Sequence, residues 1–253
     1  MAAPNRSPHP GAAPTTGARG EEGGAPRRAL GHAGDPEGGL GLLLLLDGHA
    51  LVYRAFHALP ELTGPTGEPT HAVYGFARML FKAIEELRPT HVAAAFDTAA
   101  PTFRKTEWDA YKAQRPPTPD GLRPQFDRVY QLLQALGVPI YRLDGYEADD
   151  VLGALARQAA AAGLEVVILT GDTDALQLVG PRVWVMVPRQ GVSDFTLYDP
   201  EKVRERYGLE PSQLADVRAL RGDASDNIPG LPGVGEKTAA RLLQEFGSVE
   251  ALL

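Results

Sequence analysis

The chain has 253 residues, with 25 Lys and Arg against 32 Asp and Glu, and it contains no cysteine. The lack of cysteine excludes disulfides, thiolate zinc sites and a cysteine nucleophile, and it fits a reducing compartment. The formal net charge of -7 argues at first against a polyanionic partner. With 43% hydrophobic residues, the chain can build a sizeable core.

Residues 1–40 differ in composition from the rest of the chain. They contain 9 Gly, 8 Ala and 6 Pro without apolar periodicity, so we expect a disordered tail. The apolar run that follows, 42–46, is too short for a membrane span and lacks the pattern of a signal peptide. We therefore expect a cytoplasmic protein that has no membrane partner. The helix start at Gly247-Ser248 is cut short, so we also expect a fragment.

Short apolar runs alternate with segments of helical periodicity over residues 41–198. The runs lie at 42–46, 91–96, 138–142, 165–169 and 183–187, and the helical segments at 70–87, 124–136 and 149–161. This alternation predicts an α/β domain with a mainly parallel central sheet and helices on both faces. From residue 199 to 253 helical patterns dominate, at 200–207, 211–220 and 236–246. We expect a helical subdomain there, packed on the sheet.

The segment from 102 to 128 interrupts the alternation and is long for a loop, which favours a functional role. Basic and aromatic side chains interleave in it, as is typical where single-stranded nucleic acid stacks. Four acidic residues in the same segment leave a solvated surface hairpin as the alternative. The interleaved basic and aromatic residues are Phe103, Arg104, Lys105, Trp108, Tyr111, Lys112, Arg115, Arg123, Phe126 and Arg128.

Nine acidic residues have little obvious structural use. Several directly follow the predicted strands, and the carboxyl ends of parallel strands form the ligand crevice of such a sheet. Without these nine, the other 23 acidic residues nearly balance the 25 basic ones, so nucleic acid remains a plausible partner. The nine are Asp47, Asp97, Glu147, Asp149, Asp150, Asp172, Asp174, Asp223 and Asp226.

Each acidic motif also has a local explanation, as a helix cap or an Asx turn. Their conjunction is what favours a metal site, because all-oxygen ligands select hard cations such as Mg²⁺. So many carboxylates can hold two ions, and an ion pair about 4 Å apart serves in-line attack of water on a phosphoryl group. No Ser/His/Asp array, Walker A motif or dinucleotide fingerprint competes with this hypothesis.

A glycine-rich turn leads into the last long helical segment, within the sequence IPGLPGVGEKTAARLL from residue 228. Backbone amides at such a turn and helix N-terminus can bind a DNA phosphate without reading bases. An ordinary helix-turn-helix joint is the alternative. The candidate residues are Gly230, Gly233, Val234, Gly235, Glu236, Lys237, Thr238 and Arg241.

From about Leu42 to Leu253 the sequence resembles the 5'-3' exonuclease domain of bacterial DNA polymerase I and the related flap endonucleases. The resemblance is carried by LLLLDGHALVYRAFHAL, FDTAAPTFRKTEWDAYKAQRPPTPDGLRPQ, GYEADDVLGALA, ILTGDTDALQLV and LRGDASDNIPGLPGVGEKTAARLL. It implies a PIN-like 5' nuclease fold with a helical arch at about 102–128 and a helix-turn-helix (H3TH) subdomain. The implied activity is cleavage of DNA at 5' ends, flaps or nicks, including RNA-primed ends, in replication and repair. Further expectations are a monomer associated with the nucleoid and a polymerase domain in the full-length protein.

The resemblance also implies roles for individual residues. Asp47, Asp97, Glu147, Asp149 and Asp150 would serve a first Mg²⁺, and Asp172, Asp174, Asp223 and Asp226 a second, with Mn²⁺ as a substitute. Lys112, Arg115, Arg104 and Tyr111 would lie in the arch near the scissile phosphate. Backbone carbonyls of Leu220, Arg221, Pro229, Leu231 and Val234 would hold K⁺.

Two departures from the family pattern stand out. Thr173 lies where relatives often have Lys, and the chain ends before the family's remaining C-terminal helices. A PIN-like endoribonuclease and a non-catalytic DNA-binding module are the alternative functions. The first would lack the glycine-rich turn, and the second would not need all nine acids.

Overall fold

The computed structural model describes residues 41–253, so the tail expected at residues 1–40 lies outside the described part. The core is a six-stranded sheet in the order β3-β2-β1-β4-β5-β6. Only β6 is antiparallel to its neighbour. The strands are β1 (Leu42–Asp47), β2 (His91–Ala95), β3 (Ile140–Tyr141), β4 (Glu165–Leu169), β5 (Val183–Pro188) and β6 (Phe195–Tyr198). The predicted α/β fold with a mainly parallel sheet is confirmed.

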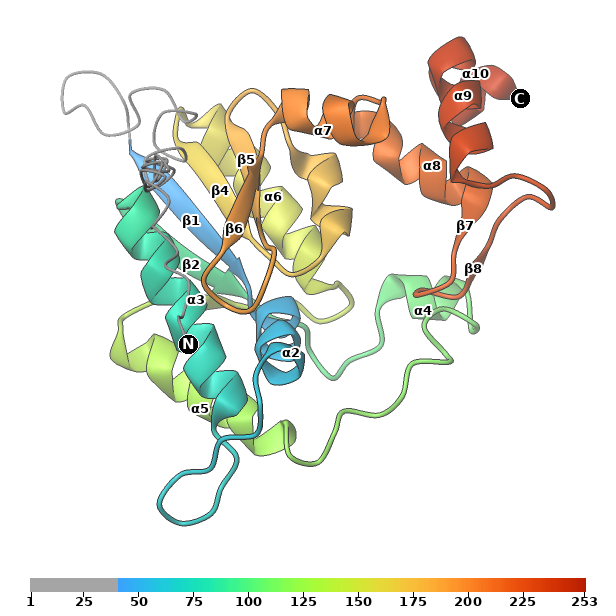
Figure 1. Ribbon diagram of the computed structural model, residues 1–253. Helices are drawn as coiled ribbons and strands as arrows, with labels where there is room; N and C mark the ends of the chain where they lie inside the picture. Colours follow the sequence, from blue (N-terminus) through green and yellow to red (C-terminus); the bar gives the residue numbers. More distant parts are fainter. Residues whose placement is uncertain (1–40) are drawn as a thin grey trace, which may run out of the picture.

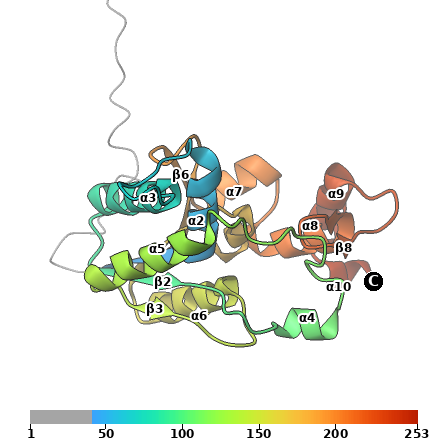
Figure 2. The ribbon, with the colours of Figure 1, turned by 90° about the horizontal axis from the view of Figure 1, so that it is seen from below.

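Helices cover both faces of this sheet (Figures 1 and 2). Leu44 and Leu46 pack on one face against α2 (Gly48–Ala58), α3 (His71–Leu87) and α5 (Arg123–Ala135). Leu45, between them in β1, packs on the other face against α6 (Ala148–Ala161) and the 3₁₀ helix η1 (Thr173–Leu178). Successive strand side chains point to opposite faces, so an uninterrupted leucine run is what a doubly covered strand requires.

Helix α2 and strand β6 of the sheet domain were not predicted. Helix α2 starts directly after β1, where the carboxylate of Asp47 accepts a hydrogen bond from the amide of Ala50 at 3.1 Å. Strand β6 adds to β5 at one edge of the sheet. Within the described residues, no helix is both long and apolar enough to cross a bilayer.

The segment expected to form a helical arch is mostly not helical. Before α5 begins at Arg123, only α4 (Phe103–Glu107) is a helix, and turns and extended chain occupy the stretch between the two. Pro116, Pro117 and Pro119 lie in the extended part, and proline lacks the amide that a helix interior needs. The segment nevertheless leaves the sheet and reaches the C-terminal part of the chain (Figure 2).

The chain beyond Tyr198 is mainly helical, with α7 (Pro200–Tyr207), the 3₁₀ helix η2 (Pro211–Gln213), α8 (Leu214–Arg221), α9 (Glu236–Phe246) and α10 (Val249–Leu252). Val203 and Leu214 join the sheet's second core, whereas Leu220, Leu243 and their neighbours form a small core of their own. A two-residue ribbon, β7 (Gly222–Asp223) with β8 (Ile228–Pro229), follows α8. The chain after β8 lies close to the end of α8, because a Cβ atom on Gly230 would lie 2.1 Å from the carbonyl carbon of Arg221.

Candidate active site

The strand ends bring the acidic residues together. Asp47 ends β1 and is in register with Ala95, the last residue of β2. Asp97 follows β2 by two residues, and Asp172 follows β4 by three. A hollow of about 410 Å³ lies at this edge, lined by Asp47, Asp97, Glu147, Asp149, Asp172, Asp174 and Asp226. Asp150 and Asp223 line the two adjoining hollows instead.

The carboxylates in this hollow repel one another in a poorly solvated place. Burial, followed by the charges of Asp47, Asp172 and Asp97, raises the pKa of Asp149 to about 8. Burial likewise raises the pKa of Asp174 to about 7 and that of Asp47 to about 6. Such shifts arise when carboxylates share a site without enough positive charge. A cation bound among them would relieve the repulsion.

The carboxylates do not form a ready-made ligand shell. No three His, Asp or Glu side chains of residues 41–253 are arranged as a preformed metal cluster. Several of the acids are instead directed at basic side chains. The all-oxygen donor set and the mutual repulsion fit a hard divalent cation, but the acids would have to exchange partners to bind one.

Thr170 links two of the acids. Its fully buried hydroxyl donates to Asp47 Oδ2 at 2.6 Å and accepts from the amide of Asp172 at 2.9 Å. Hydrogen bonding from Thr170 lowers the pKa of Asp47 against the larger effect of burial. One hydroxyl therefore fixes the carboxylate at the end of β1 and the chain leaving β4. Sequence reasoning missed Thr170, whose only signal is its place directly after the β4 run.

Asp97 is held by a neutral histidine. His49 Nδ1 accepts a hydrogen bond from the Asp97 amide at 3.1 Å, while Asp97 Oδ1 accepts from the amide of Ala148 at 2.8 Å. Because Nδ1 is an acceptor here, its 3.3 Å contact with Asp97 Oδ2 is not an ion pair. Burial lowers the pKa of His49, in keeping with a neutral ring.

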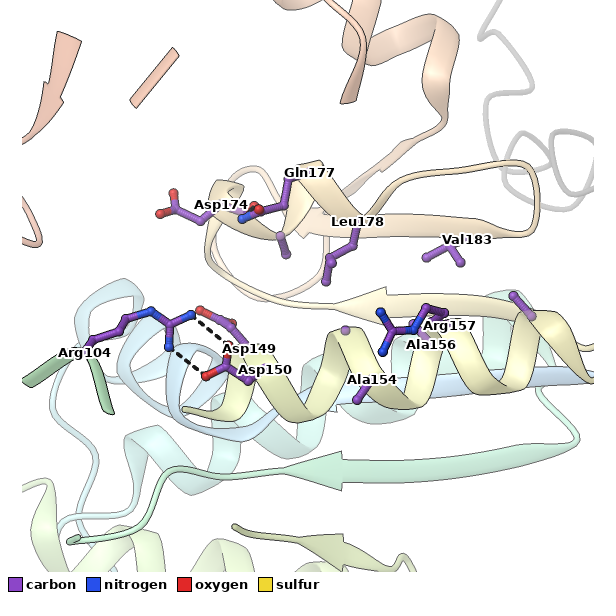
Figure 3. Close-up of a pocket in the computed structure, with 13 residues that line it drawn as sticks. Arg104, Asp149, Asp150, Ala154, Ala156, Arg157, Asp174, Gln177, Leu178 and Val183 are labelled. Carbon is purple, nitrogen blue, oxygen red and sulfur yellow. Dashed lines mark hydrogen bonds and ion pairs between the residues drawn. The ribbon is translucent and has the colours of Figure 1, made fainter. Parts of the chain in front are cut away.

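The acidic residues at the start of α6 have different roles: Asp150 stabilises the helix start, whereas others face the site. Asp150 Oδ2 accepts from the amide of Glu147 at 3.0 Å, which is the capping role considered from the sequence. Asp150 also binds Arg104 through two hydrogen bonds of 2.7 Å each (Figure 3). The Arg104 guanidinium lowers the pKa of Asp150. Glu147 and Asp149, unlike Asp150, line the hollow of about 410 Å³, which we call the acidic hollow.

A bridging segment, residues 108–115, crosses the site. Lys112 Nζ lies 2.9 Å from both carboxylate oxygens of Glu147. Arg115 Nη2 lies 2.5 Å from Asp226 Oδ1. The Tyr111 hydroxyl lies 3.1 Å from Glu147 and from Asp226, and burial and then these two carboxylates raise the pKa of Tyr111. Lys112 and Arg115, both predicted from the sequence, therefore pair with two of the predicted acids.

Arg218 of α8 lines the adjoining hollow that also contains Asp174 and Asp223. Its guanidinium contacts Asp174, and its Nε lies 3.6 Å from Asp223 Oδ2. Burial raises the pKa of Asp223, but hydrogen bonds from Ser225 and the charge of Arg218 outweigh it, so the pKa is lowered overall. Nothing in the sequence distinguished Arg218 from the other arginines, since the contact depends on how α8 packs against η1.

The glycine-rich turn connects β8 to α9, at the right-hand edge of Figure 1. Gly233 has a φ of 80°, and α9 starts after Gly235 without a side-chain cap. Lys237 and Arg241 are exposed beside this helix start, while Glu236 pairs with Arg221 at 3.0 Å. Carbonyls of Leu220 and Leu231, expected to hold K⁺, already accept amide hydrogen bonds from Leu231 and Val234. Both binding assignments remain predictions.

Two family models cover the described chain. Residues 42–208 match the N-terminal resolvase-like domain of 5'-3' exonucleases, and residues 209–253 match their C-terminal SAM fold. The chain belongs to the 5'-3' exonuclease family.

The chain is similar to polypeptides named DNA polymerase I. It is 56% identical over 217 residues to that of Chloroflexus aurantiacus, a match covering 84% of this chain and 23% of the relative. It is 49% identical over 211 residues to that of Bacillus caldotenax, covering 83% and 24%. The chain thus spans about a quarter of the length of these relatives.

Solved structures share the fold. The T5 D15 protein co-crystallised with metal ions matches with a TM-score of 0.68 at 18% identity, over 83% of this chain and 77% of that one. The catalytic core of Rad2 in complex with a DNA substrate matches with a TM-score of 0.52 at 19% identity, over 83% and 63%.

Proposed function

We propose that the chain is a metal-dependent 5' nuclease that hydrolyses DNA phosphodiesters at 5' ends, flaps and nicks. The observation that supports this most directly is the hollow lined by seven carboxylates, beside Lys112 and Arg115 of the bridging segment. A site with both acidic and basic side chains suits a reaction in which cations and a phosphate bind next to each other. In the reaction, a water oxygen bonds to phosphorus and the bond to the 3'-oxygen breaks, leaving a 5'-phosphate and a 3'-hydroxyl.

Asp47, Asp97, Asp149, Asp172 and Asp174 are the residues we propose to hold divalent cations, with Mg²⁺ as the natural choice and Mn²⁺ as a substitute. When bound, such ions activate water and stabilise negative charge on the phosphoryl group. The neighbour co-crystallised with metal ions shares this fold. We include Glu147, Asp150, Asp223 and Asp226 as outer partners, each of which contacts a basic side chain. Asp174 would have to leave Arg218 to bind an ion.

The basic residues would change partners when DNA binds. Lys112 and Arg115 neutralise Glu147 and Asp226 in the free chain, and a cation among the acids would release them toward a backbone phosphate. Arg104 stays with Asp150, because its two-point contact also orders the start of α6. The glycine-rich turn and α9, with exposed Lys237 and Arg241, would hold the duplex through its backbone.

The wider context forms part of the proposal. The relatives named DNA polymerase I extend well beyond the matched region, so we propose a polymerase domain on the full-length polypeptide and a role in replication and repair in the cytoplasm. RNA-primed 5' ends on a DNA template would then be substrates. A labelled RNA-primed substrate, compared with an all-DNA one, tests this part separately.

Cleavage of a labelled 5'-flap DNA and a matched flap RNA, with Mg²⁺ or EDTA, tests the main proposal. We expect DNA cleavage in Mg²⁺ and none in EDTA. Asp149→Asn and Asp174→Asn should each abolish cleavage while leaving duplex binding nearly unchanged, and exposed Asp120→Asn serves as the control. Binding without cleavage would instead indicate a non-catalytic module, and preference for RNA an endoribonuclease.

Lys112→Ala tests the role of the bridging segment in the chemical step. Loss of the Lys112 ammonium should slow single-turnover cleavage by about 100-fold, the scale of one electrostatic contact to the transition state. A normal rate under those conditions would remove Lys112 from the site.

A further inference from the structure

The bridging segment is tied to the loop that follows β7. Asn227 Nδ2 donates to the carbonyl of Ala110 at 2.7 Å. The amide of Lys112 donates to the carbonyl of Asp226 at 3.0 Å. These two bonds lie on either side of Tyr111, so they fix the backbone of the residues that carry the hydroxyl and the ammonium of the site.

Both partners in this tie have unusual backbone geometry. In residues 41–253, three residues other than glycine have a left-handed φ, and two of them are Lys112 at 53° and Asn227 at 59°. Asparagine tolerates this region better than other residues, whereas lysine is disfavoured in it. A non-glycine residue keeps such a conformation only when its surroundings enforce it. The hydrogen bonds to Asp226 and from Asn227 are the contacts that do so here.

A second side chain strengthens the tie from the other direction. Gln114 Nε2 donates to the carbonyl of Ala224 at 2.7 Å. Neither Gln114 nor Asn227 lines the acidic hollow, whose walls include Lys112 and Arg115. Both amides therefore act on the bridging segment and touch none of the nine acids.

We propose that Asn227 is a positioning residue that, with Gln114, holds Lys112 in its left-handed conformation and so directs the ammonium into the site. This inference rests on the proposed nuclease function. If the tie is lost, Lys112 is free to adopt an ordinary backbone conformation, and its ammonium no longer has a fixed place beside Glu147. The effect should be on the chemical step, because the tie fixes Lys112 beside the acidic hollow, whereas the proposed duplex contacts Lys237 and Arg241 lie on α9.

Asn227→Gly is the most informative variant, since glycine accepts the left-handed φ and only the amide donor is lost. We expect single-turnover cleavage of the 5'-flap DNA in Mg²⁺ to slow about tenfold, the scale of one hydrogen bond, with the dissociation constant for DNA almost unchanged. Gln114→Ala should act in the same direction. Gln131→Ala, another exposed glutamine with one side-chain hydrogen bond, is the matched control and should leave the rate unchanged.

A double-mutant comparison separates positioning from general destabilisation. In a Lys112→Ala background, Asn227→Gly should slow cleavage no further, because the group that it positions is gone. The proposal is overturned if Asn227→Gly cleaves at the normal rate, or if it slows the Lys112→Ala protein by the same factor as the parent.

A spectroscopic test does not depend on activity. Trp108 lies in the bridging segment and is 46% exposed, and the other tryptophan, Trp184, is buried in β5. With Trp184→Phe, the anisotropy of Trp108 reports the motion of the segment. We expect it to fall in the Asn227→Gly and Gln114→Ala proteins and to stay unchanged in Gln131→Ala. Unchanged anisotropy in both variants would refute the tie, whereas an inactive parent protein would refute only the nuclease function.

Discussion

Arg104 and Asp150 form a two-point contact, in which both terminal nitrogens of the guanidinium lie 2.7 Å from the two carboxylate oxygens. Asp150 also caps the first turn of α6 by accepting from the amide of Glu147. The pair therefore connects α4 to the acidic end of α6, at one end of the hollow that runs along this helix (Figure 3).

Arg104→Lys should weaken this connection, because an ammonium cannot reproduce the fork geometry of the guanidinium. We expect a loss of about 1 kcal/mol in the free energy of unfolding, since the pair is partly exposed. Urea denaturation measures it. Arg157→Lys on the exposed side of the same hollow is the control, and equal losses in the two variants would contradict the special role of Arg104.

Thr170→Val removes the hydroxyl shared by Asp47 and Asp172 and keeps the side-chain shape. We expect a loss of about 1–3 kcal/mol in the free energy of unfolding, the range for a buried hydrogen bond to a charged group. The loss should be greater at pH 8 than at pH 5, because the pKa of Asp47 is about 6 and its carboxylate is ionised only at the higher pH. Exposed Thr106→Val is the control. A loss independent of pH would indicate that the hydroxyl serves packing alone.

The metal-free protein should become less stable as the pH rises. The ordinary pKa of an aspartate is 3.8, and the folded values of Asp47, Asp174 and Asp149 are about 6, 7 and 8. Folding therefore favours the protonated forms, so their contribution is complete below pH 3.8 and is lost as the pH rises to about 8. The lowered pKa values of Asp150 and Asp223 have the opposite effect, but below this window. The lowered pKa of His49 opposes the trend below its ordinary pKa of 6.5, as one group against three. Denaturation in EDTA at several pH values measures the slope.

Asp149→Asn should reduce that slope and stabilise the metal-free protein at pH 8 by more than about 1 kcal/mol, the equivalent of one pKa unit. The reason is that the amide removes a buried charge from a repulsive group. At pH 4, where Asp149 is protonated in the folded state, the variant should differ little from the parent. Asp120→Asn is the exposed control, and destabilisation of Asp149→Asn at pH 8 would contradict the repulsion.

Mg²⁺ should raise the melting temperature, and more at pH 8 than at pH 6, because the cation competes with protons for the same carboxylates. Thermal denaturation in Mg²⁺ and in EDTA measures the difference. Asp149→Asn should remove most of the rise, while exposed Asp120→Asn should keep it. An equal rise in both variants would place the ions elsewhere.

Arg218→Ala removes the positive charge between Asp174 and Asp223. We expect a loss of about 2 kcal/mol in the free energy of unfolding in EDTA at pH 8, because two partly buried carboxylates lose their partner. Mg²⁺ should restore part of it, since an ion can take over the neutralising role. Exposed Arg128→Ala is the control. A loss that is the same with and without Mg²⁺ would show that Arg218 only stabilises the packing of α8 on η1.

Sequence patterns determined the sheet and the acidic edge. The five apolar runs became β1 to β5, and the acids after them converged because parallel strands present their carboxyl ends at one edge. Hydrophobic periodicity depends on residues close together in the chain, so a single sequence is enough to detect it. Helix α2 was not predicted because it follows β1 without a break. Strand β6 was not predicted because it pairs only with β5, at the edge of the sheet.

Only the tertiary structure decided which partner each charge has. Asp149 and Asp150 are adjacent, yet a helix turns by about 100° per residue, so one enters the hollow and the other meets Arg104. Asn227 and Arg218 gained their contacts from the approach of the C-terminal subdomain to the bridging segment and to η1. Such contacts join residues far apart in the chain, and no local pattern encodes them. The sequence by itself determined the fold and the identity of the acids, and packing decided how they are neutralised.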